Sequence, residues 1–358
     1  MDIAQLLQFA CQQGASDLHI SAGEAPMIRN HGDMKRIKVP ALTAEQTQAM
    51  IYDIMSDSQR KHFEEFSEAD FSMALGDVAR FRVNVFRQNR GLGAVFRQIP
   101  TKIQTLEELS MPSILADISR KEKGLVLVTG PTGSGKSTTM AAMIDLINRE
   151  YEGHIMTIED PIEFVHLSRK CLVNQREVGA HTQSFSNALR AALREDPDIV
   201  LVGEMRDLET IQLALTAAET GHLVFGTLHT SSAPKTVDRV IDVFPPNQQA
   251  QVRAMFAESI QAIITQTLCK KNGGGRVAAL EILLGTVAVR NLIREGKIHQ
   301  IPSVMQTQGA TGMQTMDAAL RQLVEKNLIS RETAMEKSGN PDLFKEQDME
   351  AGVGSKKR

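Results

Sequence analysis

The sequence has few of the residues that cross-link small secreted proteins or stack on nucleic-acid bases. Among 358 residues there are three cysteines, two tyrosines and no tryptophan, and aromatic residues make up 4%. Cys11, Cys171 and Cys269 are odd in number and far apart, so we expect neither a disulfide framework nor a paired-cysteine zinc site. A reducing compartment is the simplest interpretation. The scarcity of aromatic residues argues against a base-stacking surface.

Long apolar runs and an excess of one charge are also missing. No apolar run reaches the roughly 18 residues that a membrane span requires, and Met1-Asp2-Ile3 does not begin a secretory signal. Lys and Arg number 40 against 43 Asp and Glu, a formal net charge of −3, which argues against a duplex-binding surface over the whole protein. We therefore expect a cytoplasmic protein with no direct membrane insertion and no nucleic-acid partner.

One segment fits the phosphate-loop pattern G-x-x-x-x-G-K-[ST]. It lies between an apolar, β-branched run at 124–129, which predicts a buried strand, and a run at 138–147 with helical apolar spacing. Glycine-rich backbone N–H groups and a helix N-terminus both attract anions. In this pattern Lys136 reaches the β- and γ-phosphates and Ser137 binds Mg²⁺. The residues expected to hold the nucleotide are Gly130, Pro131, Thr132, Gly133, Ser134, Gly135, Lys136, Ser137 and Thr138.

From Gly124 onward, predicted strands alternate with predicted helices, which indicates an α/β fold with a parallel sheet. Ligands of such sheets bind beyond the carboxyl ends of the strands. The strand at 154–158 is followed by an acidic cluster that ends at Glu163, which suits water activation or metal binding, or is a solvated turn. The strand at 198–204 ends in Glu204, which we expect near Mg²⁺ or its water. Arg206 follows closely, so an ion pair is the alternative role for Glu204.

The strand predicted at 223–228 lies between two histidines. His229, at the carboxyl end, is placed to sense a γ-phosphate, whereas His222 favours a structural or interface role. Further along, apolar residues at helical spacing from Val252 to Leu268 predict a single helix. We expect a loop at 305–316 and a last amphipathic helix from Leu320 to Leu328.

The first hundred residues predict a mixed domain of helices and strands. Apolar spacing from Ile3 to Ala10 predicts a helix, Thr43 with Gln46 predicts a capped helix, and residues 30–33 predict a hairpin turn. Strict alternation predicts strands at 80–85 and 94–99. Five arginines on or beside these strands suit either a solvated face or a surface that faces an anion; they are Arg80, Arg82, Arg87, Arg90 and Arg97.

The domain boundaries follow from composition. A polar segment bounded by prolines predicts a linker at 101–112, between a first domain at 1–100 and a second at 113–344 that includes the C-terminal helices. The tail at 345–358 has few apolar residues and is predicted to be disordered.

With these motifs in place, the chain closely resembles the type IV pilus retraction ATPases of the twitching-motility family, within the secretion ATPase superfamily. The resemblance runs from residue 14 to about residue 343. The segments that carry it are the phosphate loop at 130–138, an aspartate box at 157–164, a Walker B motif at 202–207, a histidine box at 221–230 and a retraction-linked motif at 288–295. Val289 stands in the last motif where Ile is usual.

The resemblance implies a homohexamer of two-domain subunits. A RecA-like P-loop ATPase domain with a parallel-rich sheet would follow a smaller PAS-like α+β domain. ATP would be hydrolysed with Mg²⁺ to power pilus retraction through an inner-membrane platform protein, at the cytoplasmic base of the pilus. An accessory retraction ATPase is a further candidate partner.

The resemblance also implies roles for single residues. Glu163 would polarise the attacking water, Glu204 would act near Mg²⁺, and Arg82 or Arg97 would reach a phosphate. The residues implied in coupling hydrolysis to movement are His222, His229, Arg290 and Arg294.

Four alternatives remain open on the sequence. The chain resembles an accessory retraction ATPase almost as well. Extension and type II secretion ATPases usually carry a tetracysteine zinc motif, which this chain lacks. From other classes, a nucleic-acid-dependent RecA-type motor and a regulator that binds nucleotide without hydrolysing it both fit the phosphate loop.

Overall fold

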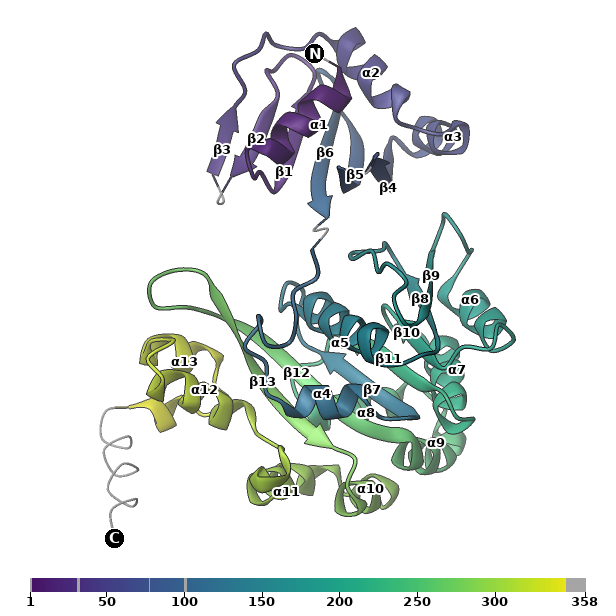
Figure 1. Cartoon of the computed structure of the whole chain (residues 1–358), viewed down its shortest axis with the longest axis vertical. Helices are drawn as coiled ribbons and strands as arrows, with labels where there is room; N and C mark the ends of the chain where they lie inside the picture. Colours follow the sequence, from purple (N-terminus) through teal and green to yellow (C-terminus); the bar gives the residue numbers. More distant parts are fainter. Residues whose placement is uncertain (1, 31–32, 77, 100–101, 346–358) are drawn as a thin grey trace. The chain divides into compact units, whose positions relative to one another are not determined.

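The computed structural model describes residues 2–30, 33–76, 78–99 and 102–345, and the chain divides into two compact units (Figure 1). The first comprises residues 1–102 and 161–165, and the second comprises 103–160 and 166–358. Most of the tail predicted to be disordered lies outside the described residues, as do residue 100 and residue 101, the first residue of the predicted linker. None of the described helices combines the length and apolar character needed to cross a membrane.

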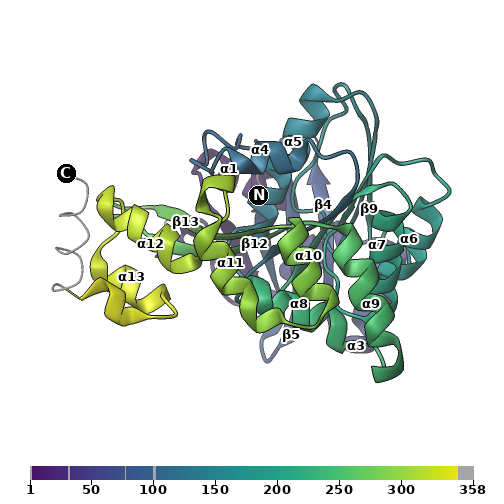
Figure 2. The ribbon, with the colours of Figure 1, turned by 90° about the horizontal axis from the view of Figure 1, so that it is seen from below.

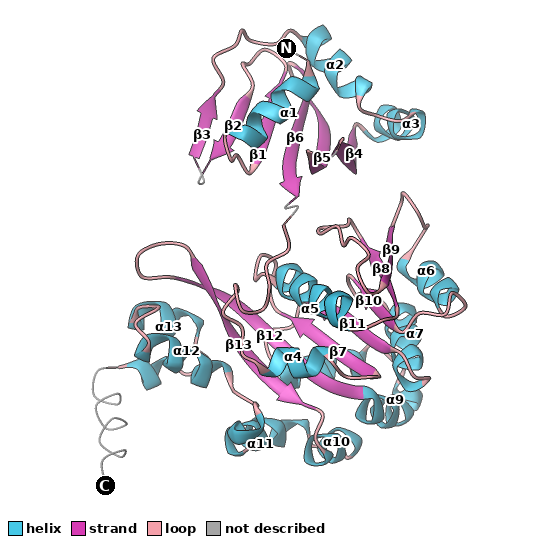
Figure 3. Ribbon diagram, viewed as in Figure 1, coloured by secondary structure: helices cyan, strands magenta, loops and turns pink. Residues whose placement is uncertain are grey.

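The first unit is a six-stranded antiparallel sheet with three helices (Figure 3). Its strand order is β3-β2-β1-β6-β5-β4. The helices are α1 (Ile3–Gln12), α2 (Ala44–Asp53) and α3 (Asp57–Phe66), and the strands are β1 (Asp17–Ser21), β2 (Met27–Asn30), β3 (Asp33–Arg36), β4 (Glu68–Leu75), β5 (Ala79–Gln88) and β6 (Gly91–Ile99).

Local sequence explains these elements. The predicted capping box of Thr43 and Gln46 is present at the start of α2, and β2 and β3 form the predicted antiparallel pair, although residues 31–32 of the turn lie outside the described residues. Along β5, Phe81, Val83 and Val85 are buried, whereas the intervening side chains lie on the opposite face. The arginine strands therefore present one apolar and one polar face, as predicted.

The second unit is built on a seven-stranded sheet with the order β13-β12-β7-β11-β10-β8-β9. Every neighbouring pair is parallel except β12 and β13. This arrangement confirms the predicted parallel-rich α/β fold. The strands are β7 (Gly124–Thr129), β8 (His154–Glu159), β9 (Leu172–Glu177), β10 (Ile199–Val202), β11 (Leu223–Leu228), β12 (Ile260–Lys270) and β13 (Arg276–Leu284).

Helices cover both faces of this sheet (Figure 2). Because alternate residues of a strand point to opposite faces, Leu125 and Leu127 of β7 pack in one core and Val126 and Val128 in the other. The helices are α4 (Ile114–Ser119), α5 (Lys136–Glu150), α6 (Phe185–Ala192), α7 (Leu208–Glu219), α8 (Ala233–Asp242), α9 (Pro246–Ser259), α10 (Val287–Arg294), α11 (Ile301–Thr307), α12 (Met316–Glu325) and α13 (Arg331–Lys337).

Four predictions of local structure were wrong in type or in bounds. The helix predicted from Val252 to Leu268 ends at Ser259, and the rest of the run is the central strand β12. A strand that is buried on both faces is apolar throughout, so its pattern is hard to distinguish from that of a buried helix. The predicted loop at 305–316 contains the end of α11 and a short 3₁₀ helix. Strand β10 ends at Val202, so Glu204 lies in the following turn, and the last predicted helix ends at Glu325, before α13.

Candidate nucleotide-binding site

The phosphate loop connects β7 to α5, as the sequence predicts. Strand β7 is buried along its whole length and fixes where the loop begins. The loop turns through Gly130, Gly133 and Gly135, whose φ angles of 141°, 76° and 87° favour glycine. Lys136, the first residue of α5, donates from Nζ to the carbonyls of Gly130 (2.8 Å) and Pro131 (3.1 Å). Its ammonium group therefore lies within the curve of the loop.

Gln266 of β12 fixes the inner side of this loop. Its side chain, in a residue that is 1% exposed, donates from Nε2 to the carbonyl of Ser134 (2.6 Å) and accepts from the hydroxyl of Thr139 (2.7 Å). A Cβ atom at Gly135 would lie 2.7 Å from that Nε2, and one at Gly130 would lie 2.3 Å from the Gln266 carbonyl oxygen. Two glycines of the motif are thus required by the close approach of β12.

The loop also holds a buried hydroxyl that suits an anion. Ser134 is 3% exposed, and its Oγ has no hydrogen-bond partner among the described residues. A buried hydroxyl without a partner costs about 1–3 kcal/mol. Together with the N–H groups of the loop and the N-terminus of α5, Ser134 makes this segment fit a phosphate group.

Glu204 lies in the turn after β10 and contacts a guanidinium group and an imidazole ring. Its carboxylate is bonded to Arg206 (2.5 Å) and to Nε2 of His229 (3.1 Å), which follows β11. Burial raises the pKa of Glu204, but the hydrogen bond from Arg206 and the charges of Arg206, His229 and Lys136 outweigh it, and the net pKa lies below its usual value. The structure therefore brings Glu204 and His229 together near Lys136. It also shows that the ion pair with Arg206 considered as an alternative is present.

The acidic segment after β8 begins with a carboxylate held by the sheet. Glu159 accepts from the hydroxyl of Thr157 (2.6 Å) and from the carboxamide of Gln175 on β9 (3.1 Å). Glu163 is exposed and belongs to the first unit, whereas the phosphate loop belongs to the second. Its role as the residue that polarises water stays a prediction.

The two arginines expected to reach a phosphate are paired with carboxylates in the first unit. Arg82 binds Asp70 through two nitrogens, the shorter contact being 2.6 Å, and Arg97 Nε lies 2.9 Å from Asp17. Burial raises the pKa of Asp17, while hydrogen bonds from Ser16 and Arg97 lower it, with a net decrease. The side chain of Arg97 is 69% exposed and that of Arg82 45%, so both remain accessible.

The remaining predicted residues lie at the edges of the second unit. His222 precedes β11, with Nδ1 3.0 Å from the carbonyl of Ala217, which fits a structural role. On α10, Arg290 donates to the backbone carbonyls of Gly285, Glu258 and Ile260 at 2.7, 2.6 and 2.9 Å. Arg294 forms an ion pair with the Glu258 carboxylate.

Gln266 is the site residue that the sequence analysis missed. It lies in the run that was predicted as a helix. A helix at this position gives no indication of which side chains point toward the phosphate loop. The signal available in the sequence is the apolar, β-branched character of Ile263, Ile264 and Thr265, because such residues favour strands.

A phosphate loop between a buried parallel strand and a helix, with a carboxylate beside its lysine, defines the class of P-loop nucleoside triphosphatases.

Comparisons with known proteins narrow this class. The family model for "Type II/IV secretion system protein" matches residues 1–346. The chain is 65% identical over 344 residues to the type IV pilus retraction ATPase PilT of Pseudomonas aeruginosa, covering 96% of this chain and 100% of that protein. It is 40% identical over 336 residues to the type IV pilus ATPase PilU of the same organism, covering 94% and 88%.

A solved structure of a retraction ATPase matches the fold of this chain as well. The crystal structure of the pilus retraction motor PilT with bound ADP matches with a TM-score of 0.91 at 50% identity, covering 96% of this chain and 98% of that one. The chain therefore belongs to the type IV pilus retraction ATPases, within the type II/IV secretion system family, and is an ATPase.

Proposed function

We propose that this chain is the motor that powers type IV pilus retraction, as a homohexamer that acts on an inner-membrane platform protein at the cytoplasmic base of the pilus. The observation that carries the proposal is the 65% identity over the full length of a retraction ATPase. The identity to the type IV pilus ATPase PilU is lower, at 40%, which favours the main retraction motor over the accessory one. An accessory retraction ATPase then becomes a candidate partner of this chain.

The nucleotide is ATP, held by the phosphate loop. The loop amides and the buried Ser134 hydroxyl bind phosphate oxygens, and Lys136 exchanges its carbonyl contacts for the β- and γ-phosphates. Mg²⁺ fits the oxygen donors at this site, the Ser137 hydroxyl directly and Glu204 directly or through water. When bound, the cation would neutralise charge on the phosphates.

Hydrolysis needs a water molecule and charge stabilisation. Glu163 polarises the attacking water as a general base, and its side chain is exposed. Arg82 or Arg97 then exchanges its carboxylate partner for a phosphate. For Arg82 this exchange is inexpensive, because an ion pair of two half-exposed side chains contributes only about 0–1 kcal/mol. For Arg97 it costs more, because the buried carboxylate of Asp17 would lose its guanidinium partner.

Movement follows from changes at the site. His229 contacts Glu204, so a change in the charge near Glu204 alters the end of β11 and the histidine box that includes His222. Arg290 and Arg294 anchor α10 to the end of α9. These residues are the proposed route from the site to the C-terminal helices.

The first experiment separates binding from turnover. Lys136→Ala is expected to lower nucleotide affinity by more than about 100-fold, because a central cation is lost. Glu163→Gln is expected to bind ATP normally and to lower kcat by more than about 100-fold. Glu152→Gln, at an exposed position after α5, is the control and should hydrolyse ATP like the wild type. Normal hydrolysis by Glu163→Gln would refute the assignment of Glu163.

The second experiment tests the motor function in cells. A strain that lacks the gene should regain pilus retraction and twitching with the wild-type gene and not with Glu163→Gln. Size measurement of the purified protein with ATP should give a hexamer. Full retraction in the absence of the gene, or nucleic-acid-stimulated hydrolysis without any effect on pili, would overturn the proposal.

A further inference from the structure

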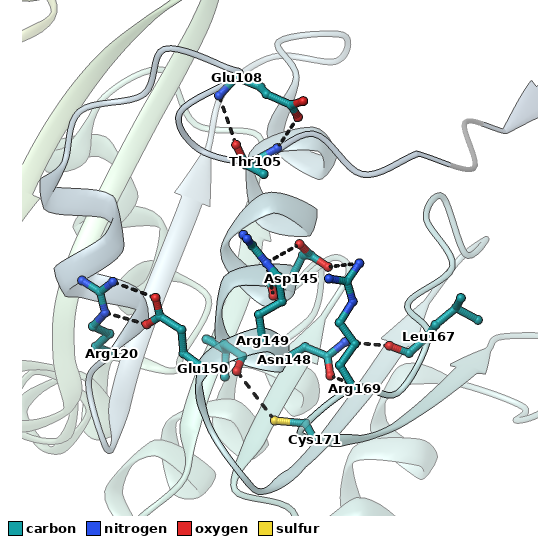
Figure 4. A network of polar contacts seen from close by, with 11 residues as sticks. Thr105, Glu108, Arg120, Asp145, Asn148, Arg149, Glu150, Leu167, Arg169 and Cys171 are labelled. Carbon is teal, nitrogen blue, oxygen red and sulfur yellow. Dashed lines mark hydrogen bonds and ion pairs between the residues drawn. The ribbon is translucent and has the colours of Figure 1, made fainter.

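The segment that follows the acidic loop is fixed to the far end of the phosphate-loop helix. We call residues Leu167–Cys171 the stem. Asn148, in the last turn of α5, donates from Nδ2 to the carbonyl of Leu167 (2.7 Å) and accepts at Oδ1 from the N–H of Arg169 (3.0 Å). Its backbone carbonyl accepts from the N–H of Lys170 (3.0 Å). Figure 4 shows the side chain of Asn148 reaching from α5 to the stem.

Further contacts hold the stem in the same place. Asp145, one turn earlier and 5% exposed, pairs with Arg149 at 3.0 Å and with Arg169 of the stem at 3.7 Å. The thiol of Cys171 donates to the carbonyl of Tyr151 (3.0 Å). The last turn of α5 is therefore bonded to the stem through side chains and backbone, not through apolar packing alone.

The choice of asparagine at this position has a physical reason. Asn148 is 1% exposed, and a buried carboxamide is costly unless its donor and acceptor are both paired. Asparagine is also a poorer helix former than alanine or leucine. Both penalties are offset here because the carboxamide pairs with the carbonyl of Leu167 and the N–H of Arg169. These two backbone groups of the stem are not part of a strand or helix.

The other side of the acidic loop is fixed by a second carboxamide. Gln175 of β9 accepts from the N–H of His166 (2.8 Å), immediately before the stem, and donates to Glu159 (3.1 Å), where β8 ends. The loop between Glu159 and the stem is thus anchored at both ends. Glu163 lies between the anchors, four residues before Leu167.

We propose that Asn148 is a positioning residue for ATP hydrolysis, which holds the stem on α5 so that Glu163 reaches its place beside the nucleotide. The proposal rests on the proposed role of Glu163. Helix α5 carries Lys136 at its first residue and Asn148 twelve residues later, about 18 Å along a rigid element. One helix therefore sets the position of the phosphates at one end and the reach of the acidic loop at the other.

The test compares turnover with binding. Asn148→Leu removes both side-chain hydrogen bonds, and Asn148→Asp replaces the donor to Leu167 by a second acceptor with hardly any change in volume. Each variant should lower kcat about 10- to 100-fold, since a misplacement of about 1 Å has that effect, while the Kd for ADP stays within about twofold. Asn174→Leu is the matched control, because Asn174 is an exposed carboxamide on β9 that contacts His154; it should keep the wild-type kcat.

A double-mutant cycle identifies the route of the effect. If Asn148 acts through Glu163, Asn148→Asp should reduce kcat no further in a Glu163→Gln background. Additive losses, or equal losses of kcat and ADP affinity that follow a lower Tm, would overturn the proposal. Normal turnover by Glu163→Gln alone would instead contradict the proposed role of Glu163 in hydrolysis, so the two failures are distinguishable.

Discussion

Gln266 gives the sharpest test of how the phosphate loop is held. In Gln266→Leu the carbonyl of Ser134 loses its donor in a buried position, while the hydroxyl of Thr139 can turn to the carbonyl of Gly135, one turn back in α5. One buried carbonyl left unpaired costs about 2 kcal/mol. If the loop can form its native shape only by accepting this cost, ADP affinity falls about 30-fold.

The assay is isothermal titration with ADP, together with urea denaturation. The control is Thr265→Val, which removes the buried hydroxyl contact between Thr265 and Thr129 (2.8 Å) in the same strand and leaves the loop bonds intact. It should lower the free energy of unfolding by about 1 kcal/mol and leave ADP affinity unchanged. A Gln266→Leu protein that is destabilised by about 2 kcal/mol but binds ADP like the wild type would refute the reasoning.

Two further predictions concern stability. Burial lowers the pKa of His166 from 6.5 to about 4, so between these pH values the unfolded chain binds a proton that the folded chain does not, and stability should fall by about 3 kcal/mol as pH decreases through this window. Urea denaturation of His166→Gln should lack this loss, whereas His62→Gln, at an exposed histidine, should retain it. On α10, Arg290→Ala should cost about 3 kcal/mol, because three charge-assisted hydrogen bonds to backbone carbonyls disappear. Arg294→Ala should cost less than about 1 kcal/mol, because its ion pair is exposed; equal losses for both would contradict this account.

The sequence was sufficient where a local pattern determines local geometry. The phosphate loop, its strand and its helix were predicted because glycine spacing and the change in apolar periodicity occur within 27 residues, 124–150. The arginine strands β5 and β6 were predicted for the same reason, since alternation specifies both strand and face. The resemblance to secretion ATPases rested on such local motifs.

The sequence was insufficient where contacts join distant segments. Gln266 meets the phosphate loop across more than a hundred residues of chain, and Asn148 meets the stem only because β8 and the acidic loop return to α5. A continuous apolar run does not reveal whether it is a helix or a buried strand, so β12 and its register were lost together. Pairing of Arg82 with Asp70 likewise depends on strand register, which no single strand encodes.

Strand β12 has a mechanical consequence. Three residues beyond Gln266, Cys269 is fully buried in a cluster with Leu320 of α12 and Ala334 of α13. An extended strand covers about 10 Å in three residues. Any shift of the phosphate loop that keeps the bonds of Gln266 must therefore be transmitted along β12, and the C-terminal helices must follow the strand or lose their packing. Strand β12 therefore links the phosphate loop directly to the last helices of the described chain.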